Sequence, residues 1–201
     1  MEFTTEIINI SKIKEGLFIG DQVASSNFYI LAQFKITHMI NAAGKSVPNL
    51  FENYGIHYLT LNWSENPSQV LFDPVDQIAK KIVSFIDDAN DKGEGLLAFS
   101  IRGQNRVCIV ILIYLMRKYN WSLTKSIDFL KSKKQDIDIS KSFLTQLSNF
   151  EKRLAKSGIE SSSTWKDCKI KDLEEEVMTN TYLNGLPIPK VNTTKKEKKK
   201  T

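Results

Sequence analysis

A seven-residue polar loop between two apolar segments constrains the fold of this chain more than any other feature. The loop, SIRGQNR, runs from Ser100 to Arg106, between the short apolar segment 96–99 and the longer apolar segment 107–119. A short apolar run that follows turn residues is typical of a strand buried on both faces of a parallel sheet, and the longer run is typical of a buried helix. We therefore predict a strand, a tight loop and a helix, in that order.

This order places the loop at the carboxyl end of a strand, where open α/β sheets bind ligands. The first backbone N–H groups of the following helix point into the loop and attract anions. A glycine lets the backbone approach an anion closely, and an arginine can bind an oxyanion through two parallel hydrogen bonds. We predict an anion-binding site formed by Arg102, Gly103, Gln104, Asn105 and Arg106. The alternative is a surface turn that carries two arginines without a ligand.

The spacing of the loop resembles the phosphate-binding signature of cysteine-dependent protein phosphatases, His-Cys-x-x-Gly-x-x-Arg-Ser/Thr. The rest of the chain resembles the dual-specificity subgroup of that family, in collinear order. The matching segments are ISKIKEGLFIGDQVASSNFYILAQFKITHMINAAG, GIHYLTLNW, IVSFIDDA and VCIVILIYLMRKYNWSLTKSIDFLKSKK. The resemblance extends over residues 7–154, about three-quarters of the chain. It implies an α/β domain with a central, mostly parallel sheet flanked by helices.

The alternation of short apolar strands with helical patterns predicts the same fold class. Strands are expected over residues 39–41, 58–61 and 96–99. A helix is expected over residues 74–90, because its apolar residues follow i, i+3, i+4 spacing. These apolar residues are Val75, Ile78, Ile82, Phe85, Ile86 and Ala89.

The resemblance implies that catalysis would need a cysteine thiolate at the position of Ser100. A serine hydroxyl attacks phosphorus only beside a general base, and the two histidines, His38 and His57, lie far upstream. Phe99 stands where the family has histidine, and Val107 stands where it has serine or threonine. The resemblance therefore implies a catalytically inactive protein without a working catalytic residue.

The resemblance also places a general acid on the segment LNWSENPSQVLFDP, residues 61–74. Glu65 falls at the acid position and Asp73 lies farther along the segment. A glutamate can donate a proton, but a solvated loop carboxylate is the alternative. Cys108 lies two residues after Arg106. Its side chain is expected to point into the packing of the helix against the core, as a small apolar group.

Composition limits the class of protein further. Hydrophobic residues make up 41% of the chain, enough for an ordinary core, and the apolar segment 107–116 is too short to span a membrane. The N-terminus, MEFTTEIINI, carries acidic residues and does not resemble a secretory signal. Cys108 and Cys168 lack metal-ligand spacing, so we predict a cytoplasmic chain without a metal site, a cofactor or a disulfide framework.

The positive charge is concentrated in a C-terminal tail. The net charge is +5, and residues 190–201 hold six lysines and one glutamate, so that 6 − 1 = +5 and the other residues sum to zero. Such a block is usually disordered, but it can also contact an acidic surface. The absence of interleaved aromatic residues and of an amphipathic stripe argues against nucleic acid and membrane partners. The clustered lysines are Lys195, Lys196, Lys198, Lys199 and Lys200.

The segment before this tail begins with a Ser-rich stretch and is too apolar for a pure linker. We predict that it binds along a protein surface. Its apolar residues are Trp165, Tyr182, Leu183, Leu186 and Ile188. The predicted organisation is an N-terminal extension (1–6), a phosphatase-like domain (7–155), a binding segment (156–189) and a Lys-rich tail (190–201).

Three functions fit these features. The first is a binding module whose loop still holds a phosphate, a sulfate or an acidic side chain. The second is a structural component of an assembly. By resemblance, proteins of this fold occur on ciliary doublet microtubules, so tubulin or another axonemal protein with an acidic surface is an expected partner and the cilium an expected location. The third is an active phosphatase with an unusual nucleophile.

Overall fold

Five strands form one sheet whose centre is parallel. The computed structural model describes residues 8–159 and gives the strand order β1-β2-β5-β3-β4. The strands are β1 (Ile10–Lys14), β2 (Leu17–Gly20), β3 (Ile36–Asn41), β4 (His57–Thr60) and β5 (Gly95–Phe99). The β1–β2 pair at one edge is antiparallel, whereas β2–β5, β5–β3 and β3–β4 are parallel. The predicted central, mostly parallel sheet is confirmed, and β5 lies in its middle.

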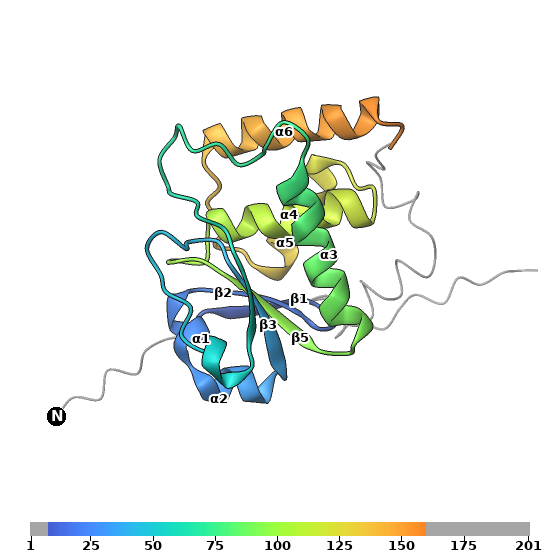
Figure 1. The fold of residues 1–201 in the computed structure, drawn as a ribbon. Helices are drawn as coiled ribbons and strands as arrows, with labels where there is room; N and C mark the ends of the chain where they lie inside the picture. The colour runs from blue at the N-terminus through green and yellow to red at the C-terminus, as the bar shows by residue number, and fades with distance from the viewer. Residues whose placement is uncertain (1–7, 160–201) are drawn as a thin grey trace, which may run out of the picture.

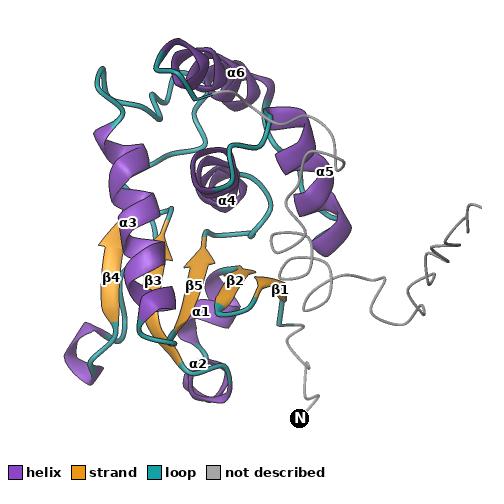
Figure 2. Ribbon diagram, turned by 90° about the vertical axis from the view of Figure 1, so that its right-hand side faces the viewer, coloured by secondary structure: helices purple, strands orange, loops and turns teal. Residues whose placement is uncertain are grey.

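Helices cover the sheet on both faces. Four longer helices gather on one side, and two short helices lie on the other (Figures 1 and 2). The longer helices are α3 (Gln77–Asp91), α4 (Arg106–Lys118), α5 (Leu123–Lys133) and α6 (Lys141–Lys156), and the short ones are α1 (Gln22–Ser26) and α2 (Phe28–Gln33). A 3-10 helix, η1 (Glu52–Tyr54), precedes β4.

The alternation of side chains along β5 divides the core into two clusters. Leu96 and Ala98 face the larger cluster under the longer helices, whereas Leu97 and Phe99 face the smaller cluster beside α2. Successive strand residues point to opposite faces, so a strand that is apolar throughout must be covered on both. The continuous apolar pattern of this segment therefore indicated a strand at the centre of the sheet.

α4 runs through the larger core. Every residue from Val107 to Met116 is 0% exposed. The predicted helix, 107–119, differs from the observed one by a single residue at each end. A helix buried on all sides fixes the 100–106 loop that leads into it, because its first turn cannot shift without disturbing the packing.

The predicted start of the helix before the loop was wrong by three residues, since α3 begins at Gln77 rather than at Pro74. Asp76 takes a left-handed backbone conformation with φ of 54°, which interrupts the helix. The carboxylate of Asp73 instead accepts hydrogen bonds from the N–H groups of Gln77 (2.9 Å) and Ile78 (2.8 Å). These backbone hydrogen bonds, that of Gln77 first, lower the pKa of Asp73. Asp73 therefore caps α3.

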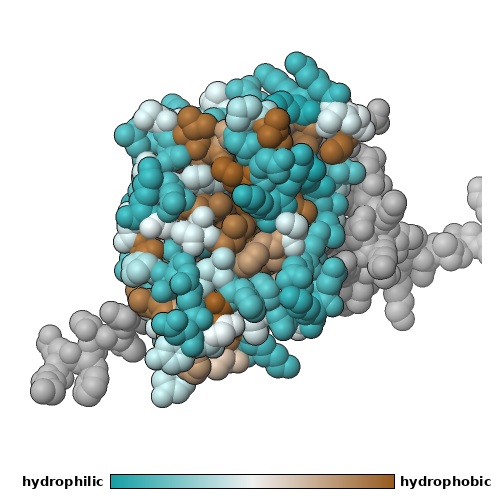
Figure 3. Space-filling model, in the orientation of Figure 1, coloured by the Kyte–Doolittle hydropathy of each residue, from teal (hydrophilic) through white to brown (hydrophobic). Residues whose placement is uncertain are grey.

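The surface shown in Figure 3 is mostly hydrophilic, with separate apolar patches. The most exposed large apolar side chains among residues 8–159 are Phe28, Tyr29, Leu50, Tyr54, Val70, Val75 and Ile101. No helix of this part of the chain combines the length and the apolar character needed to cross a membrane. The predicted binding residues from Trp165 to Ile188 and the lysine cluster lie outside the described residues.

Candidate anion-binding site

The 100–106 loop joins the carboxyl end of β5 to the N-terminus of α4 (Figure 2). Residues 101–105 form a series of bends. Among residues 8–159, their five backbone N–H groups donate to no protein acceptor. Free N–H groups in a tight loop before a helix attract anions, because the partial charges of the loop and of the helix terminus add.

Gly103 is required by the packing of the loop. Its φ of +70° is in the left-handed region, and a Cβ there would lie 2.9 Å from the carbonyl oxygen of Gly20. The loop therefore passes directly over the end of β2. The sequence predicted that this glycine would admit an anion, and the structure adds a second reason for it, the close approach of two backbone segments.

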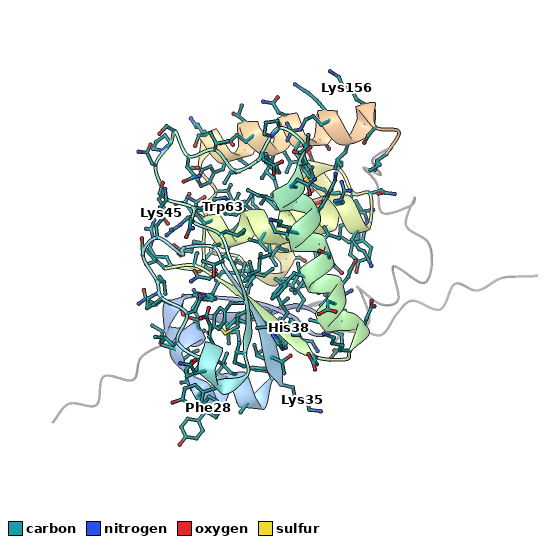
Figure 4. All side chains as sticks on the ribbon, viewed as in Figure 1. Phe28, Lys35, His38, Lys45, Trp63 and Lys156 are labelled. Carbon is teal, nitrogen blue, oxygen red and sulfur yellow. The ribbon has the colours of Figure 1, made fainter. Side chains whose placement is uncertain are left out.

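Arg106 is the buried cation of the site, with 1% of its surface exposed. Its Nη1 donates to the carbonyl oxygen of Trp63 at 3.0 Å, and its Nη2 donates to Oε1 of Glu65 at 3.3 Å. Its Nε has no hydrogen-bond partner within the described part of the chain. Figure 4 labels Trp63, which lies next to α4. Buried polar groups are normally hydrogen-bonded, so an open donor on a buried guanidinium indicates a place for an acceptor.

Glu65 joins the two arginines of the loop. Its Oε2 accepts from Nη2 of Arg102 at 3.4 Å, while its Oε1 accepts from Arg106. The Glu65 side chain is 37% exposed and that of Arg102 is 63% exposed. The sequence offered a vestigial acid or a solvated carboxylate at this position. The structure places Glu65 in a bridge between Arg102 and Arg106.

The side chains of Gln104 and Asn105 bind neighbouring parts of the protein. Nε2 of Gln104 donates to Asp136 at 3.2 Å, and Oδ1 of Asn105 accepts from the N–H of Ser140 at 3.3 Å. The carbonyl oxygen of Gln104 accepts from the N–H of Asp138 at 2.9 Å. These contacts hold the loop against the α5–α6 connection. Only the backbone N–H groups of Gln104 and Asn105 remain for an anion.

The three changed signature positions have distinct surroundings. Ser100 is 1% exposed, and within residues 8–159 its hydroxyl has no hydrogen-bonded carboxylate or imidazole. Phe99 lies in the smaller apolar cluster, on the other face of the sheet from α4. Val107 is packed in the larger core. The signature has polar side chains at these last two positions, whereas Phe99 and Val107 make apolar contacts here.

Neither histidine is close to Ser100. His38 pairs in register with Leu96 on β5, and Ser100 lies four residues farther along, on the order of 13 Å at about 3.3 Å per residue. His57 is aligned with His38 on β4, at the sheet edge. Their rings lie 5.0 Å apart, at the opposite end of the strands from the loop.

Cys108 packs inside α4 as the sequence predicted. It is fully buried, and burial raises the pKa of its thiol to about 12. Its Sγ contacts the carbonyl oxygen of Gln104 at 3.1 Å. A thiol with so high a pKa carries almost no thiolate near neutral pH.

Sequence reasoning missed the anchoring of the 61–76 loop on α6. Arg153 donates two hydrogen bonds to Asp76, at 2.9 and 2.7 Å, and the rings of Phe72 and Phe150 stack at 4.7 Å. Gln146 contributes two further bonds, accepting from the N–H of Leu71 and donating to the carbonyl oxygen of Gln69. These contacts join residues more than 70 positions apart, so no local sequence pattern could predict them. Trp63 was also missed, although a tryptophan three residues after the end of a strand was a usable signal.

No group of three or more His, Cys, Asp or Glu side chains within residues 8–159 could hold a metal ion. A cavity of about 510 Å³ lies at the amino ends of the strands, between β1, β5 and α2, away from the loop. Its charged lining residues are Lys12, Lys14, Glu15, Lys35 and Glu94.

Comparison with known proteins places this geometry in a family. The model of the dual specificity phosphatase catalytic domain matches residues 17–153. Human dual specificity protein phosphatase 6 is 36% identical over 146 residues, which cover 70% of this chain and 36% of that protein, so the match spans only about a third of the relative. Dual specificity protein phosphatase 1B of Arabidopsis thaliana is 28% identical over 147 residues, covering 73% of this chain and 84% of the relative.

Solved structures agree with this assignment at the level of the fold. The human tyrosine phosphatase-like serine/threonine/tyrosine-interacting protein superposes with a TM-score of 0.65 at 20% identity, over 73% of this chain and 98% of the other. A leucine rich repeat and phosphatase domain containing protein from Entamoeba histolytica gives 0.63 at 21% identity, over 76% and 96%. This chain belongs to the dual-specificity phosphatase family.

Proposed function

We propose that this chain is a catalytically inactive dual-specificity phosphatase-like protein that binds an oxyanion in its 100–106 loop. The observation that carries the proposal is the buried guanidinium of Arg106. Its Nε donates a hydrogen bond to no protein acceptor among the described residues. The five residues that precede Arg106 have backbone N–H groups that likewise donate to no acceptor among the described residues. The proposal separates two properties of the family, the binding of a phosphoryl group and its hydrolysis.

Hydrolysis lacks its nucleophile. A serine hydroxyl needs a base to remove its proton as it attacks phosphorus. No carboxylate or imidazole bonds to Ser100 within residues 8–159, and both histidines lie at the other end of the strands. Cys108 does not substitute, because its thiol is buried and its pKa is raised to about 12. Glu65 would have no leaving group to protonate.

Binding of an anion depends on hydrogen-bond donors that this loop still has. The N–H groups of the loop belong to the backbone and do not depend on the residue at position 100. Hydrogen bonds to a charged group contribute on the order of 1.5–3 kcal/mol each, so a dianion that reached Arg106 and several N–H groups would be held without a covalent step.

The proposal is tested by titrating the full chain with inorganic phosphate. Arg106→Lys keeps the positive charge but loses the planar fork and the Nε donor, so affinity should fall at least about tenfold. Arg117→Lys is the matched control, in the last turn of the same helix and about 17 Å away at 1.5 Å per residue. Circular dichroism of both variants checks that the fold is kept. Equal phosphate affinity in the wild type and Arg106→Lys would exclude this site.

We also propose that the protein acts as a binding partner within a larger assembly, through its C-terminal segment. The support is the segregation of charge, since residues 190–201 hold the whole net charge of +5. An acidic protein surface, such as that of tubulin in a ciliary axoneme, is the partner that this charge favours. The contacts proposed for Trp165 to Ile188 and for the lysine cluster rest on the sequence.

A further inference from the structure

Glu65 already fills part of the proposed anion site. Each of its two carboxylate oxygens accepts a hydrogen bond from a different arginine of the loop, at 3.3 Å from Arg106 and 3.4 Å from Arg102. A carboxylate is chemically similar to the ligands that the site is proposed to bind. The protein therefore holds an internal ligand at the loop, while Nε of Arg106 and the N–H groups of residues 101–105 have no acceptor within residues 8–159.

The 61–76 loop is held so that Glu65 stays near the arginines. Two positions before Glu65, Trp63 is 3% exposed and its carbonyl oxygen accepts from Arg106. After Glu65, the loop is bound to α6 through Gln146, Phe150 and Arg153. A group tethered in this way competes as if present at millimolar concentration or above.

This internal competitor limits which external ligands can bind. A carboxylate from a partner offers the two arginines no more than Glu65 already provides, and it must also bear the entropy loss of association. A phosphoryl dianion has a further oxygen and a further charge for Nε of Arg106 and for the open N–H groups. Resting on the proposed function, we infer that Glu65 is an intramolecular competitor at the loop, so that the ligand class is a phosphoryl group and not an acidic side chain.

A different role for Glu65 would have the opposite consequence. If the bridge only held Arg102 and Arg106 in position, its removal would loosen the site and lower the affinity for any anion. If Glu65 competes, its removal raises the affinity for every anion that uses the arginines. The sign of the change therefore separates the two roles.

The experiment is calorimetric titration of the full chain with inorganic phosphate and, separately, with acetate. Three proteins are compared: the wild type, Glu65→Gln, and Glu52→Gln as a matched control at an exposed glutamate of η1. We expect Glu65→Gln to bind phosphate roughly tenfold more tightly than the wild type, as follows from removing one competing, partly exposed carboxylate. Acetate should bind measurably to Glu65→Gln and not to the wild type, and Glu52→Gln should match the wild type with both ligands.

The outcomes are distinguishable. Unchanged or weaker phosphate binding in Glu65→Gln, with binding retained in the wild type, would overturn the competitor role and leave the anion site standing. Acetate binding to the wild type as tightly as phosphate would overturn the ligand class. No phosphate binding in any of the three proteins would remove the proposed function and this inference with it.

Discussion

At the scale of single residues, the loop separates what depends on side chains from what depends on the backbone. Ser100, Phe99 and Val107 replace the side chains that the family signature uses for chemistry. Gly103 has a left-handed backbone, and α4 begins at Arg106. The loop therefore carries serine at position 100 while its backbone N–H groups and its buried arginine are present.

The first prediction is that Ser100→Cys alone restores little phosphatase activity. Phe99 and Val107 still deny a thiolate the polar partners that the family places there, each worth on the order of 1.5–3 kcal/mol when charge-assisted. The measurement is release of phosphate from an aryl phosphate, with Ser100→Ala as the control. Rapid turnover by Ser100→Cys would show that the apolar replacements do not block catalysis.

At the scale of secondary structure elements, β3, β4 and α3 enclose a histidine whose charge is disfavoured. His38 is 2% exposed and stacks edge-on against Phe85 of α3 at 5.2 Å between ring centroids. Asp88 and Glu94 lie at 3.4 and 3.2 Å from its ring nitrogens. Desolvation by burial, together with the charges of His57 and Lys92, outweighs the attraction of these carboxylates and lowers the pKa of His38 below 6.5.

We expect the stability of the domain to fall as the pH drops below about 6.5. The folded state has the lower pKa at His38, so the unfolded state binds more protons in the window between the two values, and protonation favours unfolding there. Each pKa unit between the folded and the unfolded state corresponds to about 1.4 kcal/mol in the free energy of unfolding. The measurement is the free energy of unfolding by urea at a series of pH values.

His38→Phe is the control for this pH dependence, because it removes the titrating ring and keeps an aromatic side chain against Phe85. The difference in stability between the wild type and this variant should shrink or reverse in favour of the variant as the pH falls. A wild type that gained stability relative to His38→Phe on acidification would contradict the direction of the shift.

The elements also show what local sequence patterns can and cannot indicate. β5, the 100–106 loop and α4 were predictable because each is defined by a continuous run of similar residues. The start of α3 was not, because Asp73 caps it from outside the helix and Asp76 turns toward Arg153. Likewise, the side-chain contacts of Gln104 and Asn105 were not predictable, because their partners lie on the α5–α6 connection, more than 30 positions away.

At the scale of the whole molecule, the Lys-rich tail and the apolar segment before it are proposed to bind a partner through different forces. The net charge outside residues 190–201 is zero, so a long-range attraction to an acidic partner would come from the tail. The apolar residues of segment 165–188 would instead bind by removing surface from water, which depends little on salt.

Deletion of residues 190–201 should therefore weaken partner binding at low salt and matter little at high salt. Exposed charges are screened as the Debye length falls from about 10 Å at 0.1 M to about 3 Å at 1 M. Deletion from Trp165 onward should abolish binding at both. The measurement is retention of axonemal or tubulin-containing assemblies in pull-downs across a salt series. If both deletions still bind and Arg106→Ala does not, the partner is held by the loop.

Equilibrium dialysis of the full chain against an aryl phosphate ester measures whether the loop binds a phosphoryl group without hydrolysing it. The ester is then recovered from the protein compartment and analysed. We expect the ester to accumulate with the wild type, to accumulate less with Arg106→Lys, and to be recovered intact from both. Release of inorganic phosphate that depends on Ser100, or no excess ester with the wild type, would contradict this expectation.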